Sequence, residues 1–231
     1  LAGSVACPAK TPPTTPPPAV ETDDRSPLEQ ASAAILDAWL QSSPVTATSL
    51  GDHRFDGAWP KLAPADLEAD LRRVDDGLAK LAALAAAGLS VEDRVDLEIL
   101  RSELELQRFS HEVERPWQTS PMAYARLIGD GLDDLVSRDY APATDRARAV
   151  ADRLEGLPAL AEQAVANLQP GQTMAPHTEV ARGQLDGVLL LLDEIPTRLQ
   201  GADAAQLERI ATATPPAREA VRALRDHVEA L

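Results

Sequence analysis

The stretch LSVEDRVDLEILRSELELQRFSHEVE, residues 89–114, constrains the fold more than any other part of the chain. It has the spacing of one long helix, and at about 100° per residue its apolar side chains fall on two opposite sides. The first side carries Val91, Val95, Ile99, Leu106, Phe109 and Val113, and the second carries Leu97, Leu100 and Leu104. A surface helix needs one apolar stripe, so two stripes predict a helix buried between two layers. The alternative is a single wide apolar face with additional leucines.

The remaining sequence also has the pattern of helices. Alanine and leucine dominate, aromatic residues make up 3% of the chain, and β-branched residues do not alternate with polar ones. Apolar residues recur at helical spacing in residues 28–42, 65–87, 90–114, 120–136, 144–168, 178–199, 202–211 and 216–231. Gly129 and Gly131 are expected to break one of these helices, and Pro158 to kink or split another. We predict an all-α fold over residues 28–231: a layered, multi-helix array of antiparallel helices joined by short loops.

Residues 1–27 have a different composition. The small apolar residues LAGSVA precede Cys7, the only cysteine, as in the signals of bacterial lipoproteins. Residues 8–27 are rich in Pro and Thr, cannot bury a core, and are expected to form a disordered tether. We therefore predict that Cys7 is the lipid anchor of an exported protein of the cell envelope, either periplasmic or at the cell surface. The alternatives are the remnant of a secretory signal and an incidental cysteine in a disordered tail.

The charge of the chain argues against one class of partner. The formal net charge is −15, which repels nucleic acid and anionic membrane surfaces. The sequence has neither a basic patch nor a nucleic-acid-binding motif, so no nucleic-acid partner is expected.

Residues 44–64 lack a helical period and hold an unusual set of polar and aromatic side chains. Loops of this kind carry function more often than helices do, so we predict a functional loop. Its candidate residues are Asp52, His53, Arg54 and Asp56. The Asp-His-x-x-Asp spacing is a weak signal for a metal. A loop fixed by an ion pair between Arg54 and an aspartate, and anchored by Phe55 and Trp59, fits the sequence better.

The sequence does not supply a recognisable catalytic site. His111-Glu112 begins like the zinc-binding motif HExxH, but Arg115 stands where the second histidine is needed. A nucleophile elbow, a P-loop and a dinucleotide-binding fingerprint do not occur. We therefore predict no catalytic, cofactor-binding or metal-binding residue in this chain.

Five segments occur in a fixed order along the chain: ATSLGDHRFD (residues 47–56), LSVEDRVDLEILRSELE (89–105), PWQTSPMAY (116–124), RLEGLPALAEQAVANL (153–168) and HTEVARGQLDG (177–187). Together they resemble the N-terminal half of the bacterial domain-of-unknown-function family 885, over roughly residues 28–231. That family is helical and often exported or lipid-anchored. Its members are regarded as zinc metallopeptidases, with an HExxH helix in the C-terminal half.

The resemblance implies that this chain is the N-terminal helical segment of an exported zinc-dependent peptidase and forms one wall of a peptide cleft. Zinc and the catalytic glutamate would belong to the C-terminal half, and peptides would be partners of the full-length protein. The last helical segment keeps its period to Leu231 without a C-cap signal, so the chain is expected to be cut there. The alternative is a self-contained, non-catalytic helical envelope lipoprotein that binds a partner or ligand.

Overall fold

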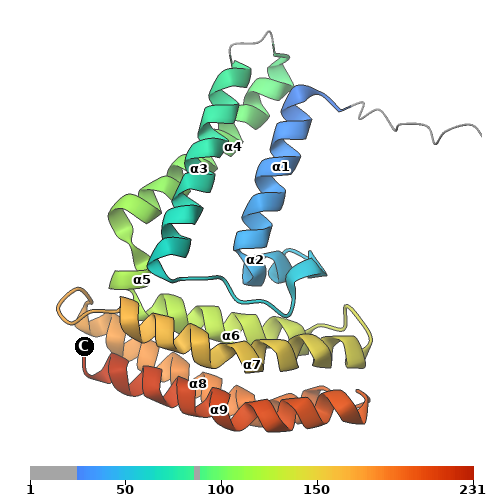
Figure 1. Cartoon of the computed structure of the whole chain (residues 1–231), viewed down its shortest axis with the longest axis vertical. Helices are drawn as coiled ribbons and strands as arrows, with labels where there is room; N and C mark the ends of the chain where they lie inside the picture. Colours follow the sequence, from blue (N-terminus) through green and yellow to red (C-terminus); the bar gives the residue numbers. More distant parts are fainter. Residues whose placement is uncertain (1–24, 86–88) are drawn as a thin grey trace, which may run out of the picture.

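The structure is a computed structural model that describes residues 25–85 and 89–231. Within these ranges it contains helices and no strand, so the predicted all-α class is confirmed. Cys7 and residues 8–24 of the predicted tether lie outside the described residues. Figure 1 shows two groups of helices, one standing on the other. We call the upright group the arm and the group beneath it the base.

The base contains four long helices in two layers. They are α6 (Pro121–Ser137), α7 (Ala143–Asn167), α8 (Ala175–Arg198) and α9 (Ala204–Glu229). Helices α6 and α7 form the layer next to the arm, and α8 and α9 form the outer layer (Figure 1). Between the layers lies the larger hydrophobic core, in which Leu132, Leu154, Leu185 and Val221 are completely buried. Burial of this apolar surface is the main stabilising contribution to the base.

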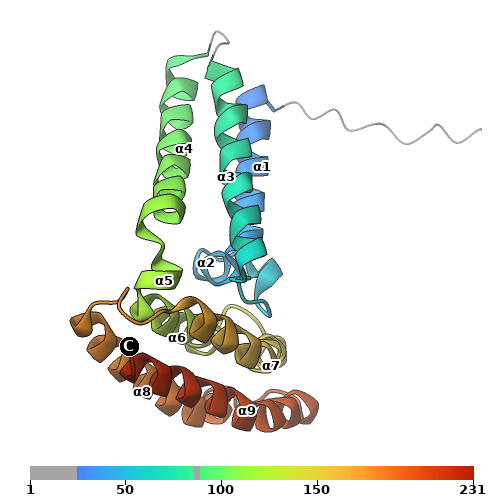
Figure 2. The same ribbon diagram turned by 60° about the vertical axis from the view of Figure 1, so that its left-hand side comes forward.

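The arm has a smaller core of its own. It contains α1 (Pro27–Ser42), α3 (Pro64–Ala85) and α4 (Val91–Phe109), and Figure 2 shows α3 and α4 side by side as an antiparallel hairpin. Its buried residues are Leu28, Ile35, Val74, Leu81, Leu97 and Leu104. Two short helices, α2 (Pro44–Ser49) and α5 (Pro116–Thr119), connect the arm to the base.

Helices begin where the sequence supplies N-caps. The Ser26 hydroxyl accepts from the Glu29 amide at 3.2 Å, and the Glu29 carboxylate accepts from the Ser26 amide at 2.6 Å, which completes a capping box. Ser90 starts α4 in a similar way, because its hydroxyl accepts from the Asp93 amide at 3.0 Å. These local contacts satisfy amide groups that the helix itself leaves unpaired.

Several predicted helix boundaries are wrong. Helix α6 continues through Gly129 and Gly131, α7 continues through Pro158, and α9 runs unbroken through Pro215 and Pro216. Each of these helices has a long buried face, and the free energy of burying it outweighs the local cost of a glycine or a proline. The same reason explains α2, where no helix was expected: Pro44 suits a first helical position, and its turn buries Val45 and Ala47.

The prediction that α4 is buried between two layers is also wrong. Leu97 and Leu104 are 3% and 2% exposed and face the core of the arm, with Leu100 half-buried beside them. The opposite stripe is 48–63% exposed at every position: Val91, Val95, Ile99, Leu106, Phe109 and Val113. In Figure 2, α3 and α1 both lie on one side of α4. No other described helix covers its outer side.

Candidate functional site

A crevice of about 770 Å³ lies where the arm meets the base. Its walls come from α1, the segment that follows Phe55, α3, the end of α4 and α5. The chain contains only three tryptophans, Trp39, Trp59 and Trp117, and all three line this crevice together with Phe55. In a chain with 3% aromatic residues, this concentration marks the crevice as the candidate binding site.

A charged cluster lies on one wall of the crevice. Nε2 of His111 lies 2.9 Å from Oδ2 of Asp70, and because a carboxylate only accepts, the imidazole is the donor. Nε of Arg73 donates to Oδ1 of Asp70 at 2.7 Å, and Nη2 of Arg73 donates to Gln107 at 3.1 Å. The His111 ring also packs against Trp117, with centroids 4.9 Å apart. The cluster therefore joins α3, the end of α4 and α5 across the crevice wall.

The ionisation of Asp70 is set by this cluster. Burial by itself would favour the neutral carboxylic acid, but the hydrogen bonds from His111 and Arg73 outweigh it and hold the pKa of Asp70 well below its usual range. Asp70 is therefore a carboxylate at neutral pH. Nη1 of Arg73 is buried and has no hydrogen-bond partner among the residues that the structure describes. A ligand oxygen in the crevice would satisfy this donor.

Unusual backbone geometry places His111 in the cluster. After α4 the chain makes a π-helical turn, Ser110–Glu114, closed by a hydrogen bond from the Arg115 amide to the Ser110 carbonyl at 2.8 Å. Arg115 then adopts a left-handed conformation, with φ 48° and ψ 58°, before Pro116 starts α5. Both features carry a local energetic cost and occur often at functional sites. The sequence predicted a regular helix to residue 114, so it did not indicate this turn.

The stability that the protein loses at acid pH should depend in part on Asp70. Its pKa is lower in the folded state than in the unfolded state, so its contribution to stability is present above the ordinary carboxyl pKa, near ~4, and is lost as the pH falls below it. From pH ~6 to pH ~3 the native protein should lose more stability, measured as the urea midpoint, than Asp70→Asn. Asp75→Asn, at an exposed position on α3, should keep the acid dependence of the native protein. If the urea midpoints of the native protein and of Asp70→Asn fall by the same amount between pH ~6 and pH ~3, this assignment is contradicted.

The predicted functional loop lies beside the crevice, and the structure separates its residues into two groups. Arg54 forms the expected ion pair with Asp52, with Nη2 2.7 Å from Oδ2, and a second ion pair with Asp37 of α1 at 2.6 Å. These groups are solvent-exposed or lie at the surface. Asp56, in contrast, is 8% exposed and belongs to a buried polar network.

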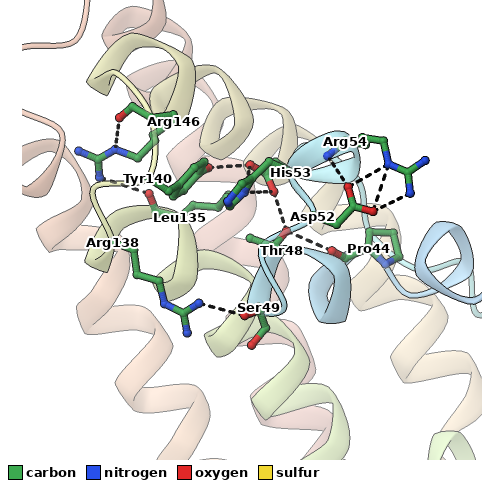
Figure 3. Close-up of polar contacts among 12 residues, drawn as sticks. Pro44, Thr48, Ser49, Asp52, His53, Arg54, Leu135, Arg138, Tyr140 and Arg146 are labelled. Carbon is green, nitrogen blue, oxygen red and sulfur yellow. Dashed lines mark hydrogen bonds and ion pairs between the residues drawn. The ribbon is translucent and has the colours of Figure 1, made fainter. Parts of the chain in front are cut away.

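The buried network connects the loop to the base. Asp56 accepts hydrogen bonds from the Thr48 hydroxyl at 2.8 Å and from the Tyr140 hydroxyl at 2.7 Å, and Nδ1 of His53 lies 3.0 Å from its carboxylate. The rings of His53 and Tyr140 stack in parallel at 3.7 Å (Figure 3). Nη2 of Arg153, which is completely buried, donates to Thr48 at 2.8 Å. Both oxygens of Asp56 are thus occupied by protein donors.

Burial shifts the pKa values of two residues in this network. Burial lowers the pKa of Arg153 to about 10, although the nearby Asp56 carboxylate acts in the opposite direction. Burial and the hydrogen bond to Asp56 together raise the pKa of Tyr140. The backbone carbonyl of Arg153 accepts a hydrogen bond from Nε1 of Trp59 at 2.7 Å. The network therefore holds in place the segment that carries Trp59 into the crevice.

The metal-binding side chains of residues 25–85 and 89–231 do not fit a zinc ion. A protein zinc site needs three or four Cys, His, Asp or Glu ligands around one point. Among the described residues, no three such side chains are grouped in a way that could hold a metal. We therefore derive no chemical step through zinc from these residues.

The geometry defines an all-α protein with a helical arm on a two-layer helical base, in which the arm and the segments that connect it to the base line an aromatic-rich crevice. The sequence profile of one family, "Bacterial protein of unknown function (DUF885)", matches residues 44–231, and the chain belongs to that family. Membership of the family that the sequence resembled is thereby confirmed over residues 44–231.

A solved structure from Shewanella oneidensis is similar to this chain. It is described as "a putative lipoprotein of unknown function", and the two share 26% sequence identity and a TM-score of 0.78. The match covers 89% of this chain and 38% of the relative, so this chain spans well under half the length of that protein. None of the curated proteins matches this chain. Among the described residues, every helix is too short or too polar to cross a bilayer.

Proposed function

We propose that this chain is the helical segment of an exported bacterial peptidase and that its crevice forms one wall of the peptide-binding cleft. The observation that carries the binding proposal is the gathering of Trp39, Trp59 and Trp117 around one crevice next to the Asp70–His111–Arg73 cluster. The peptidase assignment is supported by the resemblance of the five sequence segments. In this proposal, zinc and the catalytic groups come from a part of the protein outside these residues.

The chemistry of the crevice suits a peptide. Indole faces pack well against aliphatic, aromatic and proline side chains. The unpartnered Nη1 of Arg73 suits a backbone carbonyl or a terminal carboxylate, and the side chains of Gln107 and Lys61 supply further donors on the crevice wall. Mostly apolar walls with a few fixed polar groups are typical of a site that orients an extended ligand.

Intrinsic tryptophan fluorescence tests this proposal directly, because every tryptophan lies at the crevice. A capped pentapeptide of Ala, Leu and Phe should change the emission in a saturable way. Trp39→Ala removes one aromatic wall without touching the Asp56 network, and should weaken peptide binding about fivefold to tenfold, equivalent to ~1 kcal/mol. The measurement is the dissociation constant from the titration of each protein.

The control is Leu190→Ala, a change at an exposed apolar residue of α8 away from the crevice, which should bind the peptide like the native protein. Thermal unfolding of both variants shows that they remain folded. Chitotetraose is titrated in parallel, because sugars also stack on tryptophan. Saturation by the saccharide with no response to the peptide would contradict the proposal, as would equal peptide affinities for Trp39→Ala and native protein.

The second candidate is a self-contained, non-catalytic envelope lipoprotein that binds a ligand in the same crevice. It is supported by the description of the Shewanella oneidensis relative as a lipoprotein. Both candidates include export to the cell envelope and anchoring through Cys7. Expression behind a bacterial lipoprotein leader, followed by membrane fractionation, tests the anchor: Cys7→Ser should release the protein from the membrane fraction. Retention of that variant would contradict the anchor.

A further inference from the structure

The outer side of α4 is a continuous apolar surface. We call it the α4 stripe and define it by Val91, Val95, Ile99, Leu106 and Phe109 of α4 together with Val113 of the π-helical turn that follows. These six residues are among eleven exposed large hydrophobic side chains in the described residues, and the other five are scattered over α1, the loop after α2, the start of α8 and its exposed face. Single exposed apolar residues are ordinary, whereas a contiguous apolar stripe marks an interaction surface.

The spacing of the α4 stripe is that of a helix-packing seam. Within α4, positions 95, 99, 102, 106 and 109 follow alternating steps of four and three residues, and Val113 follows in the π-helical turn. Ser102 is the only polar side chain in this series. A seam with this repeat accepts the side chains of one further helix along its length, as in a coiled coil. The geometry therefore points to a helix as the occupant.

Charge restricts which helix can occupy the seam. The exposed residues that border it are all acidic: Glu92, Asp96 and Glu103 on one side, and Glu98, Glu105 and Glu112 on the other. Three arginines of α4, Arg94, Arg101 and Arg108, lie one position further from the seam than Glu98, Glu105 and Glu112; Arg101 lies 2.9 Å from Glu105 and Arg108 lies 3.4 Å from Glu112. A partner that packs into the seam thus meets carboxylates on both borders.

A second copy of this chain does not fit this pattern. In either a parallel or an antiparallel pairing of two α4 helices, acidic borders would lie opposite acidic borders, and like charges facing each other disfavour association. A helix with Lys or Arg on both borders of its own apolar seam is complementary. The Shewanella oneidensis relative supplies a source for such a helix, because the matched region is 38% of that chain and the remainder is additional polypeptide.

We propose that the α4 stripe is the docking surface for an amphipathic helix with Lys or Arg bordering its apolar seam, contributed by the part of the protein that extends beyond these residues in longer relatives. This surface is separate from the crevice. The crevice uses Gln107 and His111, which contact Arg73 and Asp70 on the α3 side of the helix. Docking at the stripe would thus bury the outer side of α4 and leave the crevice open.

Two synthetic helical peptides with the same Leu/Ile seam test the chemistry of the partner. One carries Lys at the border positions and the other carries Glu. In fluorescence anisotropy with the 231-residue chain, the Lys peptide should bind at least about tenfold more tightly, and its affinity should fall as salt rises from ~0.05 M to ~0.5 M. The double variant Ile99→Ser/Leu106→Ser should abolish this binding, and Leu190→Ser, another exposed apolar position, should not.

Three results would overturn the proposed partner chemistry. The first is equal affinity for the Lys and Glu peptides, and the second is no binding of either peptide. The third is a concentration-dependent dimer, seen by light scattering, that Ile99→Ser/Leu106→Ser abolishes, because it would make a second copy the occupant. Each result leaves the crevice proposal unaffected, because the peptide titration by tryptophan fluorescence does not involve the α4 stripe.

The source of the helix is tested by hydroxyl-radical footprinting with mass spectrometry. Leu106 and Phe109 should be modified readily in the 231-residue chain and several-fold more slowly in the complete product of the natural gene. Exposed apolar residues that serve as internal references, such as Leu50 and Leu190, should react equally in both. Equal reactivity of Leu106 and Phe109 in the two proteins would overturn the assignment of the partner helix to the same polypeptide.

Discussion

Asp56→Ala should lower the free energy of unfolding by about 3–5 kcal/mol, among the largest effects of any single substitution in this protein. The carboxylate accepts from the Thr48 and Tyr140 hydroxyls, and its charge favours the charged form of the buried Arg153 guanidinium. Alanine removes the acceptor from each of these donors and weakens the charge compensation of the buried Arg153 guanidinium. For a domain of this size, the thermal midpoint should fall by about 10 °C.

Circular dichroism during thermal and urea unfolding measures this effect. The matched control is Asp37→Ala, which removes an aspartate from an ion pair at 55% exposure on α1, and it should leave the midpoint almost unchanged. A second variant, Asp56→Asn, keeps an acceptor oxygen and the shape of the side chain, and should lose less stability than Asp56→Ala. If Asp56→Ala and Asp37→Ala unfold at the same urea concentration, the network does not hold the loop to the base.

Gly131→Val should destabilise the protein by about 3 kcal/mol through overpacking. A Cβ atom at position 131 would overlap the six-membered ring of Trp59 and approach Cγ2 of Val45 to 3.2 Å. Trp59 cannot move aside easily, because its Nε1 donates to the Arg153 carbonyl and Gly156 lies against the other end of the ring system. The added side chain should displace the indole, weaken peptide binding in the crevice and shift tryptophan emission.

The control for this prediction is Gly183→Val on α8. A Cβ at that position meets no atom within 4 Å, so the substitution should change stability by no more than about 0.5 kcal/mol. Both glycines are in long helices, which keeps the local helix propensity of the two substitutions comparable. Equal urea midpoints for the two valine variants would show that the absence of a side chain at Gly131 is not needed to make room for the Trp59 ring.

The sequence alone predicted the all-α class, most helix positions and the family of this protein. Those features depend on information that is local in the sequence. Examples are the helical spacing of apolar residues in 90–114, the N-cap at Ser90 and the five short segments that resemble the family. Arg54 was correctly paired with an aspartate for the same reason, because Asp52 is only two residues away.

The tertiary structure decided what local patterns leave open. Asp70 and His111 are 41 residues apart, and the Trp59 indole bonds to a carbonyl 94 residues away, so no spacing rule could bring these groups together. Helices α7 and α9 remain continuous through prolines because their buried faces outweigh a local cost. Both stripes of α4 are apolar residues at helical spacing, so the sequence pattern does not show which of them is buried. Only the placement of α1 and α3 on one side of that helix determined which stripe is core and which is exposed surface.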